Sequence, residues 1–469
     1  MMNRATTRVL LAIAAWMIPL AFATRTRAAE EVPVGVAVVD ITPGFPIRLM
    51  GYASRQTESQ GVESRLKARA IAIGADDGDG PAILVAIDNC AIVRQITEEV
   101  AARLKKKVGV KRERFVICAT HTHCGPALDN NLPFIFGKPL PADQAEHIAR
   151  YTRELTDAIE KAALAALADR KPATLAWGQG EASFAANRRA LKKGKSTGLG
   201  IQPGGPLDRS LPVLIASDSA GKARAVLFGY ACHCTTLGGE FNRICAEWAG
   251  YACDEVERRV PGATAIAIIG CGADANPEPR GKLDQAKHYG ALAGTEAHRL
   301  ASSPSGLTPL PGRIACRIRR LELPLEPAPS RAALAERGKL PGSPGFFART
   351  MVERLDAGKP IHTTVPYVVQ TWTFGDDMAI VFLAGEVVVD YSLRLKWEID
   401  SQRLWVAAYS NDVPCYIPSR RVLSEGGYEA DSSMVYYGHA SRLAPQVEDL
   451  IVDAVHAILP PAFDGPRRR

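Results

Sequence analysis

After its first 28 residues, the 469-residue sequence has no apolar run long enough to cross a bilayer as a helix. It also has no internal repeat and no low-complexity block, so nothing indicates a repeat array or a fibrous protein. No cysteine precedes Cys90, which argues against a lipid-modified N-terminus. A chain of this length can bury a large core and can form one large domain or two.

An excess of charge of one sign is also lacking once the N-terminal segment is set aside. The formal charge is +7, and residues 1–28 contribute four arginines and no acid, so the remainder carries +3. So small a charge gives little support for nucleic-acid binding. We interpret the basic run at residues 188–195 as a solvated loop, with Arg188 considered separately below.

Residues 1–28 have the pattern of a secretory signal peptide. Arg4 and Arg8 precede an apolar stretch at residues 9–23, and small residues near Ala23 and Ala28 offer cleavage sites. The apolar stretch is short for a spanning helix, so a retained anchor is the less favoured alternative. The prediction is a secreted or periplasmic protein.

The most informative motif is the segment Cys-Ala-Thr-His-Thr-His-Cys-Gly-Pro at residues 118–126, which follows an apolar run typical of a buried strand. In an extended backbone residues i and i+2 point to the same face, so His121 and His123 can aim into one pocket. Paired imidazoles at a strand end suit a zinc site.

Four more apolar runs end in polar groups of the same kind. They lead into His233, into Asp274 and Asn276, into Glu386, and into the segment that contains Tyr416. Ligands of α/β sheets bind outside the carboxyl ends of strands, so we expect one shared rim. Candidate metal ligands are therefore His121, His233, Glu386 and Tyr416, a set that leaves room for water as catalytic zinc sites do.

The ten cysteines permit disulfides without dictating them, and six lie in the rim motifs. We interpret them as small buried residues or as one or two disulfides. Zinc ligation by a thiolate, or a Cys124 nucleophile beside His123, is the alternative.

The strand and helix patterns alternate, which predicts an α/β fold. Helices are expected at residues 95–107, 142–169, 250–259, 283–301, 387–398 and 440–459. The Pro-rich stretch at 324–344 is expected to be a surface connection or a mobile flap. Metallo-β-lactamases require Asp-His after His-x-His, and amidohydrolase barrels place the pair on their first strand, so both folds are disfavoured.

Taken together, the motifs resemble the neutral (non-lysosomal) ceramidase family. The resemblance covers roughly residues 33–440 and rests on the segments at 34–43, 50–53, 65–70 and 120–126, followed in order by Asn187-Arg188, Ala231-Cys232-His233, Gly385-Glu386, Tyr416-Ile417 and Tyr428-Glu429. It implies a large single catalytic domain with two stacked mixed β-sheets flanked by helices. We assign that domain to residues 33–460, followed by a basic tail at 461–469.

The resemblance further implies a zinc ion held by His121, His233, Glu386 and Tyr416, and cleavage of an N-acyl amide bond of a sphingolipid. His123, Arg188 and Tyr428 fall where the family has substrate-contacting or orienting groups. Zinc-activated water would attack the carbonyl, and His123 would pass a proton to the leaving amine. Arg188 or Tyr428 would donate to the developing oxyanion.

The chain departs from the family pattern in two respects. Asn276 stands where ceramidases have a nucleophilic Ser, and a carboxamide can donate to an oxyanion but cannot attack. The family also extends into a C-terminal immunoglobulin-like domain, which we expect this chain to lack, so its substrate is expected to differ from ceramide.

The leading hypothesis is an exported zinc-dependent amidohydrolase acting on a lipid or other small-molecule substrate, with peripheral contact to a membrane surface and no obligate protein partner. Two alternatives stay open. One is a zinc hydrolase of an ester or a carbohydrate-linked bond, and the other is a catalytically degenerate member that binds a lipid or glycan.

Overall fold

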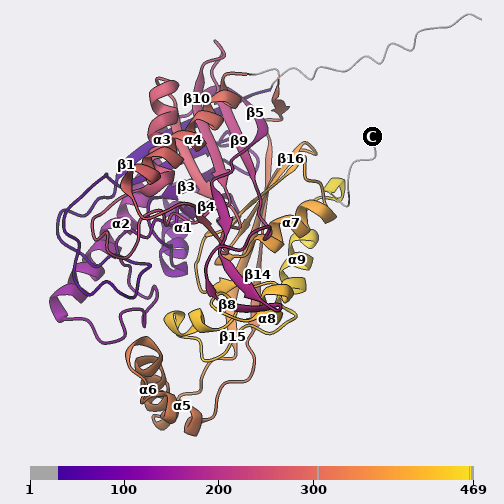
Figure 1. Ribbon diagram of the computed structural model, residues 1–469. Coiled ribbons are helices and arrows are strands. Elements are labelled where there is room, and N and C mark those ends of the chain that lie inside the picture. The colour runs from indigo at the N-terminus through magenta and orange to yellow at the C-terminus, as the bar shows by residue number, and fades with distance from the viewer. Residues whose placement is uncertain (1–29, 304–305, 464, 466–469) are drawn as a thin grey trace, which may run out of the picture.

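The computed structural model describes residues 30–303, 306–463 and 465, and its two large β-sheets have helices on their outer faces (Figure 1). The larger sheet has the strand order β11-β10-β9-β5-β1-β2-β3-β4, with β13 (Thr308–Leu310) paired to β5. Its other strands are β1 (Glu31–Asp40), β2 (Lys67–Ile73), β3 (Ala82–Ile87), β4 (Phe115–Ala119), β5 (Lys171–Glu181), β9 (Ser210–Ser217), β10 (Ala223–Tyr230) and β11 (Thr264–Ile269). The smaller sheet has the order β14 (Ile314–Pro324), β15 (Thr364–Phe374), β16 (Met378–Leu383) and β18 (Leu404–Ala407).

Both sheets are mixed, because the pairs β3–β4, β10–β11 and β16–β18 are parallel and the others are antiparallel. Alternate side chains of the two sheets share one buried core, including Leu84 and Leu227 from the larger sheet and Trp372, Phe382 and Trp405 from the smaller. Strand periodicity sends the remaining side chains outward, where helices cover them. This confirms the expected fold of two stacked mixed sheets flanked by helices.

The helices divide between the two outer faces. On the larger sheet, α2 (Ala142–Ala168) packs on β1 and β2, α3 (Glu247–Arg259) on β11, and α4 (Leu283–Ala301) on β9, while α1 (Arg94–Val108) lies beside α2. On the smaller sheet, α9 (Val447–Ile458) packs on β14 and β15, with α7 (Val389–Glu398) against it. No helix of the described ranges combines the length and apolar content of a membrane span.

Two sequence predictions about these segments were wrong in part. The helix expected at 440–459 begins only at Val447, because Leu443 instead pairs with Leu325 in an isolated bridge. The stretch at 324–344 contains α5 (Arg331–Arg337) and the start of α6 (Gly342–Asp356). Their apolar residues pack on Val435, and a Ser330 cap on the Ala333 amide begins α5, so the proline-rich composition masked a short helical hairpin.

The two ends of the larger sheet, β4 and β11, approach each other, and residues 407–411 lie between them. The Ala408 amide donates to the Ile269 carbonyl at 2.9 Å, and the Ala119 amide donates to the Tyr409 carbonyl at 3.1 Å. Tyr409 has a positive φ of 53°, a conformation that is costly for a bulky residue and often found at functional sites. This closure brings strand ends that are distant along the sheet to one rim.

Candidate metal centre and active site

Two imidazoles and a carboxylate converge at that rim. His121 follows β4, His233 follows β10, and Glu386 opens the short strand β17 (Glu386–Val387). The Nε2 atoms of His121 and His233 each lie 3.2 Å from Oε2 of Glu386, and all three residues are buried. Their ligand atoms fall within 4.8 Å of one another, close enough to hold one metal ion.

Backbone carbonyls fix the orientation of both imidazoles. His121 Nδ1 lies 2.6 Å from the Cys90 carbonyl oxygen, and His233 Nδ1 lies 2.7 Å from that of Gly272. A carbonyl only accepts, so each Nδ1 carries a proton, and in the neutral imidazoles each Nε2 lone pair faces the shared point, as in metal-binding histidines. The donor set fits zinc because His233 Nε2 and Glu386 Oε2 are buried and lack a hydrogen-bond donor.

The three groups also shift one another's pKa values. Burial disfavours ionisation of Glu386, but His121 and then His233 outweigh it and hold the carboxyl pKa well below its usual value. Burial lowers the pKa of His121 as well, yet Glu386 and Cys90 reverse this and raise it to about 10. Burial and then Arg188 lower the pKa of His233 to about 3.

Tyr416 lies beside this centre through strand pairing. It opens β19 (Tyr416–Ile417), which runs parallel to β17 with Tyr416 in register with Glu386. Arg188 Nη2 donates to the Tyr416 hydroxyl at 3.0 Å. Burial and the Glu386 charge raise the pKa of this phenol while Arg188 opposes them, and its role as a fourth ligand stays a prediction.

Arg188 is a buried hub rather than part of a solvated loop. Its Nε donates to Glu429 Oε1 at 2.9 Å and its Nη1 to Asn276 Oδ1 at 3.2 Å. The interpretation of residues 188–195 as solvated is also wrong for Arg189, which is buried and pairs with Glu429 and with Glu425 at 2.5 and 3.0 Å. The local sequence gave no sign of this, since both acids lie more than 230 positions away.

Asn276 has its carboxamide orientation set by its neighbours. It lies in β12 (Ala275–Pro277), and its Oδ1 accepts from Arg188 and from Thr235 Oγ1 at 3.1 Å. Because a guanidinium only donates, the oxygen must face it and the Nδ2 hydrogens are left to point elsewhere. Asp274 acts as a structural acceptor, taking hydrogen bonds from Asn187 Nδ2 at 3.1 Å and the Val389 amide at 2.9 Å.

His123 and Tyr428 complete the predicted set. His123 Nε2 lies 3.1 Å from His121 Nε2, while its ring packs edge-on against Tyr52 with centroids 4.9 Å apart. Gly51, at φ +97°, is required beside it, because a Cβ there would overlap the imidazole. Tyr428 is half-buried, and Arg188 stands 5.8 Å from its ring centroid. All eight predicted residues therefore lie in one region, although their roles remain predictions.

Sequence reasoning missed three contributors to this region. The Tyr437 hydroxyl donates to Glu386 Oε1, and the Tyr409 ring stacks on His121 with centroids 4.3 Å apart. Cys90 Sγ lies 3.9 Å from His121 Nδ1 and can group with His121 and His123 as metal-ligating atoms. No motif marks these positions, because their approach depends on chain closure between distant segments.

The ten cysteines all fall within the described ranges, and all are free thiols. The expectation of one or two disulfides is therefore wrong, and the alternative of buried packing residues holds for nine of them, with Cys316 partly exposed. Cys124 does not suit the alternative role of nucleophile, because it packs with Leu237 and Cys245 and burial raises its thiol pKa.

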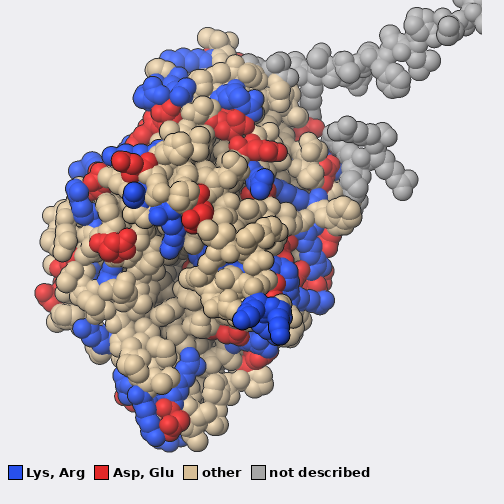
Figure 2. Space-filling view, in the orientation of Figure 1, with Lys and Arg blue, Asp and Glu red and all other residues tan. Residues whose placement is uncertain are grey.

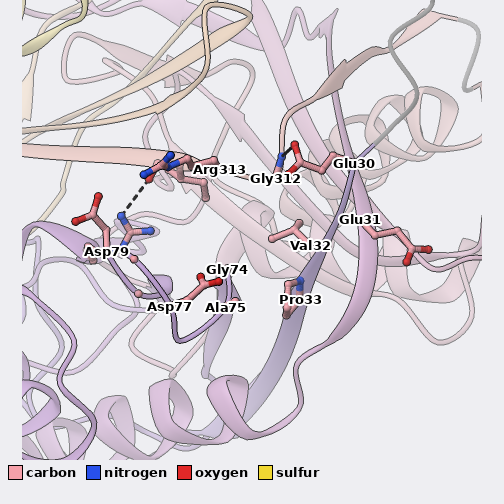
Figure 3. A pocket seen from close by; sticks show the side chains of 14 residues that line it. Glu30, Glu31, Val32, Pro33, Gly74, Ala75, Asp77, Asp79, Gly312 and Arg313 are labelled. Atoms are coloured by element: carbon pink, nitrogen blue, oxygen red, sulfur yellow. Dashed lines mark hydrogen bonds between the residues drawn. The ribbon is translucent and has the colours of Figure 1, made fainter.

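A hollow elsewhere on the molecule differs from this centre in chemistry (Figure 3). It lies at the start of β4 and β14, the opposite end of β4 from His121, and Glu30, Asp79, Arg114 and Arg313 are among its lining residues. Arg114 donates to the Ile314 carbonyl at 3.0 Å, and Asp79 pairs with Lys111 at 2.9 Å. Its lining contains no histidine or cysteine, so the candidate chemistry stays at the rim.

Comparison with known proteins gives consistent matches. A family model described as the N-terminal part of neutral/alkaline non-lysosomal ceramidase matches residues 33–276. A neutral ceramidase of Mycobacterium tuberculosis is 26% identical over 266 residues, covering 52% of this chain and 39% of that protein. Neutral ceramidase 2 of Arabidopsis thaliana is 33% identical over 96 residues, covering 20% and 12%. The chain thus spans about two fifths or less of these relatives.

Solved structures extend the match in fold beyond residue 276. The crystal structure of a Pseudomonas aeruginosa neutral ceramidase aligns with a TM-score of 0.68 at 20% identity, covering 92% of this chain and 75% of that one. A ceramidase complexed with C2 aligns at 0.67 and 18% identity, covering 92% and 76%. Since the family model spans more than half of the sequence, the chain belongs to the neutral/alkaline non-lysosomal ceramidase family of hydrolases.

Proposed function

We propose that the protein is an exported zinc-dependent amidohydrolase that cleaves an N-acyl amide with a lipid-like acyl group. The observation that carries the proposal is the convergence of His121 Nε2, His233 Nε2 and Glu386 Oε2 on one buried point. Family membership supports hydrolysis, and the signal-like residues 1–28, which lie outside the described ranges, support export.

Zinc would be held by His121, His233 and Glu386, with Tyr416 as the fourth ligand, and when bound it would supply activated water and polarise the scissile carbonyl. Asn276 lacks an acidic proton and a nucleophilic lone pair, so acyl transfer to this side chain is excluded. Its Nδ2 hydrogens are the free donors of a side chain whose oxygen is already engaged twice. We assign them to the carbonyl oxygen of the substrate as negative charge develops there.

Arg188 serves as a positioning residue in this proposal. All three of its guanidinium nitrogens contact protein acceptors, so it orients Tyr416 and Asn276 rather than approaching the substrate with an unpaired edge. His123 holds its imidazole beside His121, where Nε2 can receive a proton and return it to the departing amine. Tyr428, half-buried at the same region, offers a hydroxyl to the substrate.

A groove of mixed lining supports an amphipathic substrate with a lipid-like acyl group. Its apolar residues include Met50, Leu128, Leu132, Phe136 and Phe346, its polar residues are Asp129, Asn130, Asn131 and Lys138, and Met50 adjoins the glycine that packs on His123. Apolar walls with polar groups at one end are typical of sites for amphipathic ligands. The acyl length and the head group are not specified by this groove.

The test is metal content and hydrolysis measured together on purified wild type, His233→Ala and His288→Ala. His288 is exposed on α4, so its variant controls for loss of an imidazole outside the centre. We expect about one zinc per chain in wild type and in the control, and none in His233→Ala. Release of fatty acid from N-acyl amides should follow zinc content. A folded wild-type protein without zinc, or one that cleaves only esters, would overturn the proposal.

A further inference from the structure

The hairpin of β7 (Arg189–Lys192) and β8 (Lys195–Leu199) begins directly after Arg188, yet the proposed chemistry uses none of its outer residues. Lys192 pairs opposite Lys195, and the turn between them is Lys193-Gly194, both with positive φ. Positive φ at both central residues is typical of a tight two-residue hairpin turn. The hairpin therefore presents lysines at a defined tip rather than on a loose loop.

The other end of β8 carries exposed apolar side chains. Leu199 and Ile201 are 55% and 54% exposed, two large apolar residues within three positions. Between them, the Gly200 amide donates to the Arg188 carbonyl at 2.8 Å. Leu199 and Ile201 therefore flank a residue that is hydrogen-bonded to the backbone of Arg188.

The same hairpin is fixed to the segment that carries Tyr428 and Glu429. Lys195 Nζ donates to the Ser424 carbonyl at 2.7 Å, and a Cβ at Gly427 would overlap the Ser196 side chain. The hydrogen bond from Gly200 to Arg188 on one side and these contacts on the other hold the hairpin in place. The hairpin is consequently fixed next to Arg188 and to the segment that carries Tyr428.

The hairpin segment itself carries charge of one sign, because residues 182–207 contain no acid. Figure 2 shows Lys and Arg side chains gathered in the region of β8 and α8 (Arg420–Glu425), with Asp and Glu side chains beside them. Arg188 and Arg189 are neutralised by Glu429 and Glu425. Lys192 and Lys193 are exposed and form no ion pair among the described residues, so their charge faces outward.

We propose that the β7–β8 hairpin with residues 199–201 docks the protein on a lipid surface that carries anionic head groups, with Leu199 and Ile201 entering the interface and Lys192 and Lys193 contacting the head groups. Exposed apolar residues beside unpaired lysines suit the boundary between acyl chains and head groups. The inference rests on the proposed function in assigning a lipid-like substrate, which would pass from the surface to the site without crossing water.

A second exposed apolar group provides a contrast. Trp397 on α7 is 87% exposed, near Leu393 on the same helix. Its neighbour is Glu398, and the nearby Arg394 already pairs with Glu398 and Asp449. This face offers no unpaired cation of α7 to an anionic surface, so it serves as the matched apolar control.

The experiment measures sedimentation of the full chain with vesicles of phosphatidylcholine alone and of phosphatidylcholine mixed with phosphatidylglycerol. The variants are Lys192→Gln/Lys193→Gln and Leu199→Ser/Ile201→Ser. Lys105→Gln/Lys106→Gln on α1 and Trp397→Ser are the matched controls, with the same changes on other faces. Turnover of a water-soluble short-chain N-acyl amide is measured in parallel, because the hairpin variants leave the site intact.

We expect wild type to prefer the anionic vesicles and the lysine variant to bind them about twenty-fivefold more weakly, about fivefold per lysine. The apolar variant should bind about tenfold more weakly and keep the salt dependence of wild type, because it retains both lysines, whereas binding of the lysine variant should depend less on salt. Both controls should bind as wild type. Soluble turnover should be unchanged in every variant, and its absence in wild type alongside intact vesicle binding would refute the proposed function while supporting the docking surface.

Three results would overturn the docking surface. The first is no binding of wild type to anionic vesicles, and the second is equal binding by the hairpin variants. The third is loss of binding in Trp397→Ser alone, which would place the contact on α7. Dimerisation of wild type that is abolished by Leu199→Ser/Ile201→Ser, without vesicle binding, would identify a second copy of the chain as the occupant instead.

Discussion

Two buried polar clusters lie next to each other at the rim, and they differ in how their polar atoms are hydrogen-bonded. In the cluster of Arg188, Arg189 and Glu429, every guanidinium nitrogen donates to a protein acceptor. In the cluster of His121, His233 and Glu386, the buried atoms His233 Nε2 and Glu386 Oε2 have no hydrogen-bond partner among the described residues. A buried charge needs a partner, so the first cluster is complete and the second requires a cation.

Because of this difference, we expect substitutions in the first cluster to affect stability and substitutions in the second to affect metal binding and turnover. Removing a member of the complete cluster leaves an uncompensated buried charge, so the fold should suffer. Removing a member of the open cluster takes away a candidate metal ligand, so it should cost metal binding and turnover instead. Asp274 lies near both clusters, since its carboxylate accepts from Asn187, next to Arg188 in the sequence, and from the Val389 amide, three residues after Glu386.

The largest expected effect concerns the open cluster. Glu386→Gln should abolish turnover and the response of stability to zinc. In wild type, zinc at about a thousandfold above its dissociation constant should raise the free energy of unfolding by about 4 kcal/mol relative to chelated protein. Denaturant titrations with zinc and with chelator measure this. Glu398→Gln, at a surface ion pair, should keep the full response. An equal zinc response in Glu386→Gln would contradict the assignment.

The complete cluster should respond in the opposite way. Glu429→Gln should lower the free energy of unfolding by about 3–4 kcal/mol, because Arg188 and Arg189 lose the charge that they share. Zinc content by elemental analysis should be retained. Glu336→Gln, which breaks an exposed pair with Lys339, should change stability by less than about 1 kcal/mol. If Glu429→Gln kept wild-type stability but bound no zinc, Glu429 would belong to the metal centre and the assignment of the two clusters would be wrong.

Asp274 should give the fold a dependence on pH. Burial, with a contribution from Asp390, raises the folded-state pKa of Asp274 from 3.8 to about 6. Between these values the unfolded chain loses this proton while the folded chain keeps it, so stability falls as pH rises, by about 3 kcal/mol in all. In Asp274→Asn that fall is removed. Between pH 4 and pH 7, the stability of the variant should therefore rise relative to that of wild type. A difference in unfolding free energy that stays constant over this range would refute the role of Asp274.

Substitution of Asn276 is expected to have the smallest effect on stability and zinc content, but it should lower the turnover rate measurably. Asn276→Ala should lower turnover about tenfold to a hundredfold, because one hydrogen bond to the developing oxyanion is lost. Zinc content should be unchanged, and the free energy of unfolding should fall by about 1 kcal/mol, because Arg188 Nη1 loses one acceptor. Steady-state kinetics should place the loss in kcat rather than KM. Unchanged turnover would remove Asn276 from the chemistry.

Local sequence patterns predicted much of the fold. They also pointed to the eight candidate site residues that the structure brings together at the rim. Apolar runs followed by His121, His233 or Glu386 are short-range signals, since a buried strand that ends in a polar side chain exposes it at the sheet edge. Helix periodicity likewise predicted α4 at the residues where it occurs. The prediction for the proline-rich residues 324–344 was wrong in part, because packing against Val435 stabilises helices that the amino-acid composition did not favour.

The sequence by itself determined that apolar strands alternate with helices and that ligand-type side chains follow the strands, because both depend on spacing along the chain. Only the tertiary structure decided which of these groups are paired and which are left open. The partners of Arg188 and Arg189, and the donation from Tyr437 to Glu386, join positions more than fifty residues apart. Their pairing depends on contacts between distant segments, such as the bond from the Arg188 amide to the Asp274 carbonyl, which no local spacing encodes.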